Sequence, residues 1–351
     1  MKMPVRILLI FLCAALIIAL PFAVSSPNML NNVKMELMNG EDDGDEIDFG
    51  RLFFSVAKAE EDEEVEEEVL DEGEFGSHPE WVLPMDFSVV PPAPNADLYT
   101  EDGYEDDTIR VKIEKTQFDE GTTVIAAYVQ IADPCQLRTG VHNPKKLAST
   151  PGKSVSFLAK EWNAVIALNG NNYLFEPQKK TFEYRMGNKI KSKSNKTKDI
   201  LIIDDQGDFH LYVKSQGINK APEELKSANR KLVNAFTFGP ALVIDGELQQ
   251  LDDGYGYNPH GREPRAAIGQ MGKLSYVLVI VTAQDRSGKS GMSQSKLAEY
   301  MHELGCVQAF NLDGGNSAEM VFGKQIFKGM PGGDERTLND IIYFATMQPN
   351  D

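Results

Sequence analysis

The chain has 351 residues, of which 42% are hydrophobic and 25% charged, and this composition excludes wholesale disorder and a multi-span membrane protein. Its 35 Lys and Arg against 53 Asp and Glu give a formal net charge of −18, so we expect no nucleic-acid partner. Residues 41–75 alone hold 17 acidic and 2 basic residues, which leaves the rest of the chain close to balanced.

The N-terminal residues 1–26 read as a signal peptide or membrane anchor. Lys2 and Arg6 precede the apolar run 7–20, and Ala23-Val24-Ser25 is a plausible cleavage site. An uncleaved anchor is the alternative, because residues 7–24 just reach the length of a minimal spanning helix. Either reading predicts a secreted or cell-envelope protein that meets the membrane only through this segment.

Residues 27–80 are predicted to be an acidic disordered linker. They lack sustained periodicity, and the acidic stretch 60–74 repels itself and offers little apolar surface. The linker leaves residues 81–351 as the folded domain.

The first half of this domain predicts strands. Residues 109–113 alternate, residues 122–131 are β-branched and apolar, and residues 162–168 form an apolar run before the turn 169–172 and residues 173–175. The runs 200–203 and 209–213 flank an acidic turn, for which a plain hairpin is favoured over a calcium loop. The basic run 179–198 is taken as a surface β-loop, with a rim for an anionic polymer as the alternative. Residues 236–244 predict a further strand, which turns at Asp245-Gly246.

The C-terminal part predicts a strand, helix, strand unit. Residues 275–282 are almost wholly apolar, Ser293 is a helix N-cap, Gly305 ends that helix, and the strand 306–312 follows. A last apolar run covers residues 341–345. Because hairpin-like pairs outnumber such units, we predict an α+β fold, a single domain with a mixed, largely antiparallel sheet and a few packed helices.

Cysteine and metal signals are sparse. Cys135 and Cys306 either pair or lie separately as buried thiols. No Cys/His cluster suggests zinc, and the histidines have no ligand-like spacing. We expect no required cofactor and no dedicated metal site, although Asp285, Asp313 and Asp340 could gather around a divalent cation.

Three polar motifs follow or precede apolar strands. Residues 311–317 read Asn-Leu-Asp-Gly-Gly-Asn-Ser, so glycines after Asp313 let the backbone approach a ligand. Arg265 and Arg336 each stand ahead of an apolar run, and guanidinium groups bind phosphate well. Taken alone, the glycines could make only a hairpin turn, and each arginine could be a surface residue.

In order along residues 105–348, these motifs resemble the phosphodiester glycosidase family, which includes an enzyme that removes N-acetylglucosamine from a phosphodiester linkage. The matching segments are Asn169-Gly170, Arg265–Gly269, Gly291–Ala298, Asn311–Ser317 and Arg336–Tyr343. The chain departs from the family pattern at Asn171, Asn172, Asn316 and Ala318, and Gln284 stands where an acid is usual.

The resemblance implies hydrolysis of a sugar-1-phosphodiester, such as N-acetylglucosamine-1-phosphodiester, in an envelope polysaccharide or glycoconjugate. Since the leaving phosphomonoester is already a stable anion, one carboxylate and cationic groups can suffice. We assign Asp313 as nucleophile or general base, Arg265 and Arg336 as phosphate clamps, and Arg286 as a weaker phosphate candidate. Asn169 joins Asp313 and Arg265 in the predicted catalytic set, as a donor to sugar or phosphate oxygens. Further predicted contacts to substrate are Gly170, Asn311, Gly314, Gly315 and Ser317. The alternatives are a non-catalytic carbohydrate-binding protein with the same fold and an envelope scaffold.

Overall fold

The computed structural model describes residues 75–149, 152–171, 181–193, 196–284, 287–332 and 334–349. Residues 73–351 group into one compact unit. The predicted signal segment, the linker up to residue 74, residues 173–175, Asp285 and Arg286 lie outside the described residues, and the predicted domain boundaries stay a prediction. Among the described helices, none is long and apolar enough to cross a bilayer.

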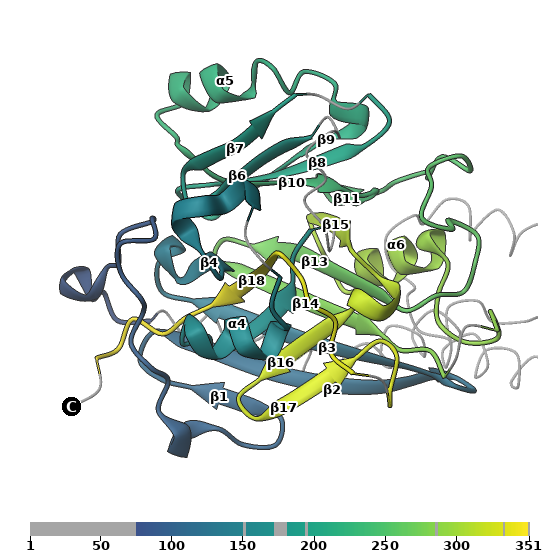
Figure 1. Cartoon of the computed structure of the whole chain (residues 1–351), viewed down its shortest axis with the longest axis horizontal. Coiled ribbons are helices and arrows are strands. Elements are labelled where there is room, and N and C mark those ends of the chain that lie inside the picture. The colour runs from purple at the N-terminus through teal and green to yellow at the C-terminus, as the bar shows by residue number, and fades with distance from the viewer. Residues whose placement is uncertain are drawn as a thin grey trace, which may run out of the picture. The chain divides into compact units, whose positions relative to one another are not determined.

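Three sheets make up the described part of the chain (Figure 1). The first has eight strands in the order β1-β2-β3-β14-β13-β15-β11-β12. In chain order these strands are β1 Gly103–Glu105, β2 Ile109–Asp119, β3 Thr122–Ile131, β11 Ala241–Ile244, β12 Glu247–Leu248, β13 Arg265–Gly272, β14 Ser275–Val281 and β15 Gln308–Leu312.

The two other sheets have five strands each. One has the order β7-β6-β10-β8-β9 and consists of β6 Phe182–Arg185, β7 Asn188–Ser192, β8 Asp199–Asp204, β9 Phe209–Tyr212 and β10 Leu232–Phe238. The other has the order β17-β16-β5-β18-β4 and consists of β4 Leu137–Val141, β5 Ile166–Asn169, β16 Glu319–Phe322, β17 Gln325–Lys328 and β18 Asp340–Phe344.

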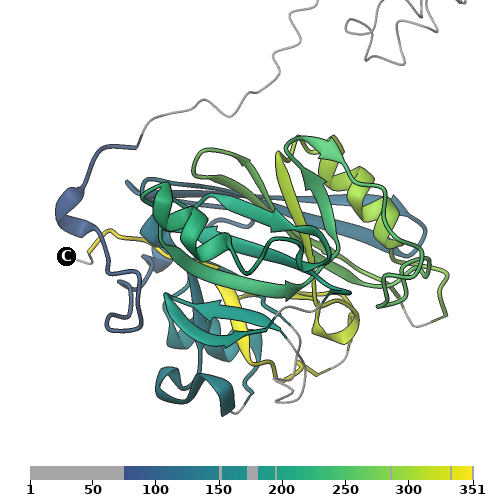
Figure 2. The ribbon, with the colours of Figure 1, turned by 90° about the horizontal axis from the view of Figure 1, so that it is seen from above.

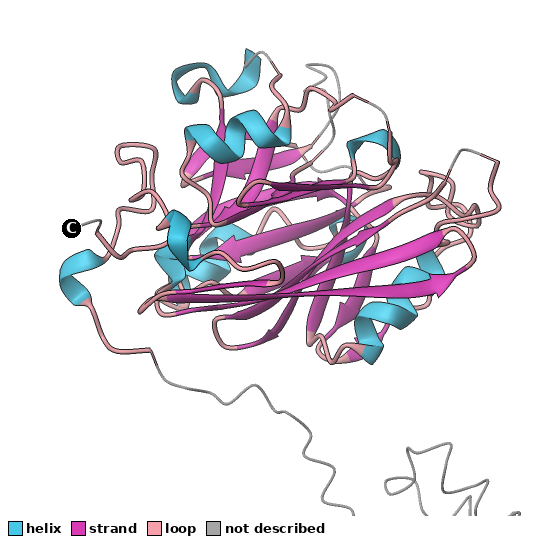
Figure 3. Cartoon of the chain, turned by 90° about the horizontal axis from the view of Figure 1, so that it is seen from below, coloured by secondary structure: helices cyan, strands magenta, loops and turns pink. Residues whose placement is uncertain are grey.

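The α-helices of the described chain are α4 Val155–Glu161, α5 Ala221–Ser227 and α6 Gln294–Glu303. Short 3-10 turns cover Pro79–Trp81, Ala96–Leu98, Pro134–Gln136, Pro144–Ser149, Val213–Ser215 and Gly315–Ser317. Figures 2 and 3 show that the helices lie at the periphery of the strand layers.

The main core lies between the inner faces of the three sheets. Strand β14 shows how the alternation of a strand divides two cores: Tyr276, Leu278 and Ile280 join the main cluster, while Val277, Val279 and Val281 pack with α6. Separate clusters join α4 to the outer face of the β5–β18 pair, and α5 to the outer face of the β8–β10 pair. Each helix therefore covers an outer sheet face, and the loops at strand ends are left to form sites.

The α+β prediction holds in its coarse form. The hairpins β2–β3, β8–β9 and β11–β12 form as predicted, and Ser293 caps α6 by accepting from the Lys296 N–H. Every described strand pairing is antiparallel, so the parallel component of the predicted mixed sheet is not found there. Strands β14 and β15 both pair with β13 and therefore run parallel to each other with β13 between them.

Three details differ from the sequence predictions. Helix α4 was not predicted. The apolar run 162–168 is not one strand, because Trp162 is the C-cap of α4 and strand β5 begins only at Ile166. The predicted strand 236–244 is two strands in different sheets. Cys135 and Cys306 are both buried and free, so of the two alternatives the separate thiols are found.

Candidate functional site

The Asp313 turn connects two sheets. Asp313 directly follows β15 of the eight-stranded sheet, and after a 3-10 turn the chain enters β16 of a five-stranded sheet. A Cβ atom on Gly314 would lie 2.6 Å from the Pro264 carbonyl oxygen, so only glycine lets the turn pass this closely to the start of β13. The sequence Asp-Gly-Gly is thus a sheet-to-sheet crossing, whereas the alternative reading of a hairpin turn is not found.

Arg265 lies beside this turn because Ala266 of β13 pairs with Leu312 of β15. Arg265 is 3% exposed, and its guanidinium donates to four backbone carbonyls: those of Met292 (2.9 Å), Tyr257 (3.0 Å), Asn258 (2.8 Å) and Gly261 (2.9 Å). Burial lowers the pKa of Arg265 to about 10. The bonded geometry favours a role in holding the loop 257–261, and the predicted phosphate contact stays a prediction.

A cavity of about 170 Å³ opens beside Asp313. Its lining includes Asp313, Arg265, Asn311, Gly314 and Gly315, so the structure brings five of the predicted site residues together. This volume lies below the roughly 300–1,000 Å³ of pockets that enclose drug-sized ligands, so the cavity can enclose only a small ligand or part of a larger one.

Sequence reasoning missed part of this lining. Glu263 supplies a second carboxylate, whose Oε1 accepts from Asn258 Nδ2 at 2.7 Å, and the Tyr257 ring stacks on Phe238 with 4.2 Å between centroids. Tyr257 and Asn258 both have left-handed φ angles of 58° and 52°, which the bonds from Arg265 to their carbonyls hold in place. Glu263 could have been found from its place two residues before Arg265, but nothing local signals Phe238.

Two asparagine side chains anchor the Asp313 turn and the strand before it through hydrogen bonds to backbone carbonyls. Asn169, the last residue of β5, is fully buried, donates to the Asp313 carbonyl at 2.7 Å and accepts the Glu319 N–H at 3.0 Å. Asn311 donates its side-chain amide to the Gly239 carbonyl at 2.8 Å. The described geometry makes Asn169 a support for Asp313, and its predicted contact to substrate stays a prediction.

Ser317 and Arg336 meet at the far end of the same turn. Arg336 Nη1 donates to Ser317 Oγ at 3.1 Å, and Arg336 as a whole is partly exposed. The structure thus places Arg336 beside the Asp313 turn, as its predicted role requires. Arg286, the weaker phosphate candidate, lies outside the described residues.

A buried charge cluster flanks Gly170. Arg185 of β6 forms ion pairs with Asp340 of β18 (2.7 Å) and with Glu183 (3.0 Å), and Asn171 donates its N–H to Asp340 Oδ1 (2.9 Å) and its amide to Glu183 Oε1 (2.6 Å). A Cβ atom on Gly170 would overlap the Asp340 carboxylate, so this position requires glycine. The surface β-loop predicted for residues 179–198 is wrong at Glu183 and Arg185, which are buried because they join two sheets.

The same cluster bears on the divalent-cation expectation. Both oxygens of Asp340 already have partners in Arg185 and Asn171. Within the described residues, no group of three or more His, Cys, Asp or Glu side chains could hold a metal ion. Asp285, the third carboxylate of that expectation, lies outside them.

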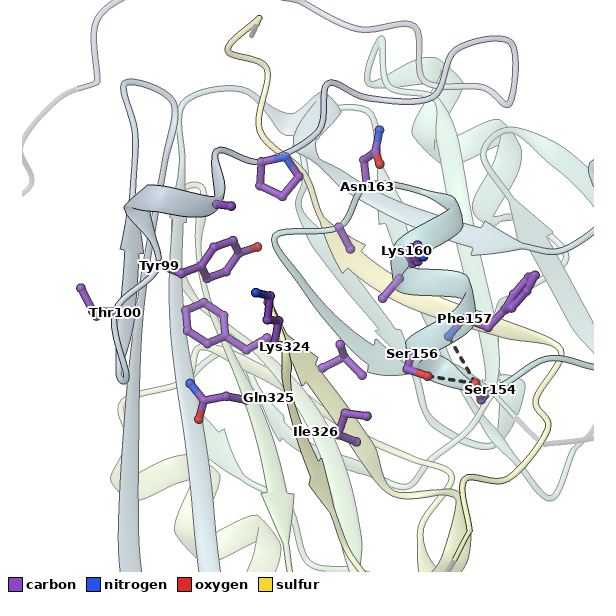
Figure 4. Close-up of a pocket in the computed structure, with 17 residues that line it drawn as sticks. Tyr99, Thr100, Ser154, Ser156, Phe157, Lys160, Asn163, Lys324, Gln325 and Ile326 are labelled. Atoms are coloured by element: carbon purple, nitrogen blue, oxygen red, sulfur yellow. Dashed lines mark hydrogen bonds between the residues drawn. The ribbon is translucent and has the colours of Figure 1, made fainter.

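A second, larger cavity of about 910 Å³ forms a groove between α4 and the β16–β17 hairpin (Figure 4). Figure 4 shows Lys324 and Gln325 of the hairpin on one side of it and Ser154 and Ser156, at the start of α4, on the other. The predicted site residues that the structure describes do not line this groove, so it is separate from the Asp313 cavity.

The model of the phosphodiester glycosidase family matches residues 162–345, just over half of the chain. The chain belongs to the phosphodiester glycosidase family. The match contains Asn169, Arg265, Asp313 and Arg336 and the loops between them. The family fold is therefore the scaffold on which the described cavity is built.

Individual proteins are similar to the chain only over part of its length or at low sequence identity. The SPbeta prophage-derived uncharacterized protein YomE of Bacillus subtilis (strain 168) is 31% identical over 110 residues, which are 31% of this chain and 17% of that protein. The catalytic domain of zebrafish N-acetylglucosamine-1-phosphodiester alpha-N-acetylglucosaminidase, auto-inhibited by its pro-peptide, superposes with a TM-score of 0.51 at 16% identity. That match covers 68% of this chain and 83% of the zebrafish chain, and it shows likeness of fold alone. A hypothetical protein from Synechocystis matches 68% of this chain and 62% of its own, with a TM-score of 0.48 and 16% identity.

Proposed function

We propose that this protein is an exported glycosidase that hydrolyses a sugar-1-phosphodiester in an envelope polysaccharide or glycoconjugate. The observation that carries the proposal is the placement of the Asp313 turn, which lines a cavity that can enclose a small ligand or part of a larger one and has a partly exposed arginine at its far end. Membership of the phosphodiester glycosidase family supports the reaction class. The predicted signal segment supports export.

The chemistry follows from the leaving group. In an ordinary glycoside the departing alkoxide must be protonated, which requires a second carboxyl group as acid. A phosphodiester-linked sugar instead expels a phosphomonoester, which is a stable anion that a cation can stabilise without donating a proton. A single carboxylate near the anomeric carbon, with an arginine near the phosphate, is then a sufficient set.

Within this proposal Asp313 acts as nucleophile or general base at the anomeric carbon. Arg336 and Ser317 contact the phosphate, since Arg336 is a partly exposed residue that bonds to Ser317 at the end of the Asp313 turn. Arg265 and Asn169 are positioning residues. Arg265 holds the loop that carries Tyr257, and Asn169 binds the Asp313 carbonyl. Glu263 is the second carboxylate that lines the cavity.

The test is phosphorus NMR on the purified full chain with an N-acetylglucosamine-1-phosphodiester, beside Asp313→Asn. A phosphomonoester signal from the unmutated protein, reduced at least about 1,000-fold in a folded Asp313→Asn variant, is the expected result. Full activity in the folded variant would remove Asp313 from the mechanism. Ligand binding without any phosphomonoester would favour the alternative function, a non-catalytic carbohydrate-binding protein, which is motivated by Gln284 and Asn316.

A further inference from the structure

The groove between α4 and the β16–β17 hairpin is a positively charged region of an acidic protein. Lys160 lines it from α4, and Lys324 lines it from the turn of the hairpin (Figure 4). None of the described residues that line the groove is acidic, and the nearby Asp97, Glu101 and Glu161 are not among them, although the chain carries a formal net charge of −18. Both lysines are exposed, and neither forms an ion pair with another described residue. The groove is therefore suited to an anionic ligand.

The rest of the lining matches the surface of a sugar chain. Phe157 and Ile326, each 44% exposed, supply apolar surface, and Asn163 and Gln325 supply amide groups. The ammonium group of Lys153 lies 4.7 Å from the centre of the Phe157 ring and adds a third positive charge. Sugar rings combine apolar C–H faces with hydroxyl groups, and a phosphate between two sugars carries the charge that lysine binds.

One end of the groove adjoins the proposed site. Ser156, which lines the groove at the start of α4, donates its hydroxyl to Glu335 at 2.7 Å, and Glu335 directly precedes Arg336. Arg336 in turn binds Ser317 at the end of the Asp313 turn. A chain of direct contacts therefore connects the groove with the residues proposed to bind phosphate.

Strand β16 shows how far the groove lies from the turn. The turn ends at Ala318, and the last two residues of β16, Val321 and Phe322, line the groove. Because a strand rises about 3.3 Å per residue, Val321 lies about 10 Å beyond Ala318, which is more than the length of one sugar ring. The groove has about 910 Å³ and the Asp313 cavity only about 170 Å³. A substrate that reaches both must therefore be a chain of several units.

We propose that this groove binds the continuing chain of an anionic polysaccharide whose sugars are joined by phosphodiesters, while the linkage to be cleaved lies at Asp313. Lys160 and Lys324 contact phosphates of that chain, and the apolar walls contact its sugars. The inference deepens the proposed function, on which its link to cleavage rests, by naming a polymer as the substrate class. Binding in the groove itself does not require cleavage.

Calorimetric titration of the full chain tests the groove directly. The probe is a synthetic oligomer of N-acetylglucosamine joined through 1-phosphodiesters, and the protein carries Asp313→Asn so that the probe is not consumed. Replacing Lys160 and Lys324 together by glutamine should raise Kd about 2- to 30-fold, because each exposed ion pair contributes up to about fivefold in affinity. At about 1 M salt, where the screening length falls to about 3 Å, the two proteins should have the same Kd.

Matched variants separate the groove from general charge and from damage to the fold. Lys220→Gln with Lys226→Gln removes the same charge from α5, outside the groove, and should leave Kd unchanged. Ala96→Trp fills the groove from an exposed position and should raise Kd at least about tenfold, whereas Ala93→Trp, exposed and outside the lining, should not. An unchanged Kd in either folded groove variant, or no binding of the oligomer by the protein with intact lysines, would overturn the proposal.

Two further probes decide the chemical class of the ligand. An oligomer of N-acetylglucosamine without phosphate should bind at least about tenfold more weakly than the phosphodiester oligomer, because it offers the lysines no charge. Equal affinity for the phosphate-free oligomer would overturn the anionic part of the proposal. A polyglutamate peptide that binds as tightly as the oligomer, in a way that depends on Lys160 and Lys324, would replace the polysaccharide by an acidic peptide.

Kinetics separate this inference from the proposed function. In the chain with Asp313 intact, the ratio of kcat/KM for the oligomer to kcat/KM for a small N-acetylglucosamine-1-phosphodiester should fall when Lys160 and Lys324 are replaced. If the small substrate is cleaved and this ratio stays constant, the groove assignment fails and the proposed function stands. If phosphorus NMR shows no phosphomonoester from either substrate while binding of the oligomer depends on the two lysines, the proposed function fails and the groove assignment stands.

Discussion

Replacing Arg265 with lysine separates two roles for this arginine. Lysine keeps the positive charge that a phosphate contact needs, but its single nitrogen cannot reach all four carbonyls that the guanidinium now binds. A holding role predicts loss of stability together with activity. A phosphate role predicts a kinetic loss in a protein of normal stability.

The size of the effect follows from those contacts. At least two of the four carbonyls lose their donor, and each buried acceptor left unpaired costs about 1–3 kcal/mol. Because part of the loop 257–261 is exposed, water can replace some of the lost bonds, and the low end of about 2–3 kcal/mol applies. Unfolding entropy of about 2.1 cal/mol/K per residue over residues 73–351 gives about 0.6 kcal/mol/K, so Tm should fall by about 3–5 °C.

The assay is thermal unfolding followed by circular dichroism, with kcat and KM measured at 25 °C on the same preparation. Arg110→Lys is the matched control, because Arg110 forms an exposed ion pair with Glu105 and its replacement should change stability by less than about 0.5 kcal/mol. An Arg265→Lys protein with the Tm of the unmutated chain and only a raised KM would refute the holding role and favour direct contact with phosphate.

Three further predictions concern the turn, the buried charges and the thiols. Gly314→Ala should lower kcat at least about tenfold with a smaller loss of stability, because the added methyl group meets the Pro264 carbonyl and displaces Asp313; an unchanged kcat would show that the turn can shift freely. Burial raises the pKa of Glu183 to about 7, so the folded state holds a proton that the unfolded state loses above about pH 4.5, and stability should fall as pH rises from 4.5 to 7. Denaturant titrations should show that Glu183→Gln flattens this slope, and an unaltered slope would assign it to other groups. Cys135 and Cys306 should resist alkylation until the protein unfolds, since burial raises the pKa of each thiol to about 12, and a reductant should leave Tm unchanged; a Tm lowered by reductant would reveal a disulfide.

Local signals predicted the elements that local interactions determine. Helix α6 begins at a serine cap and ends before Gly305, whose φ of 81° is the left-handed angle that ends helices. The placement of Asn169 and Asp313 at strand ends was predicted in the same way, because each stands beside glycine after an apolar run, and Arg265 was predicted to precede the strand that it begins.

The rest depended on contacts between distant segments. Glu183 and Arg185 lie in a lysine-rich run that indicates a surface, and only the packing of β6 against β18 buries them. The carbonyl partners of Arg265 come from a loop and a helix entry, and neither has a pattern that reveals an acceptor.

The crossing of the Asp313 turn between two sheets also determines when the site comes into existence. Its parts come from residues 169, 257–265, 313–317 and 336, so only a fragment that spans residues 169–336 contains all of them. Such distant pairings form late in folding, because their long loops must close first. The site therefore exists only once both sheets have assembled, in whichever compartment the chain completes its folding.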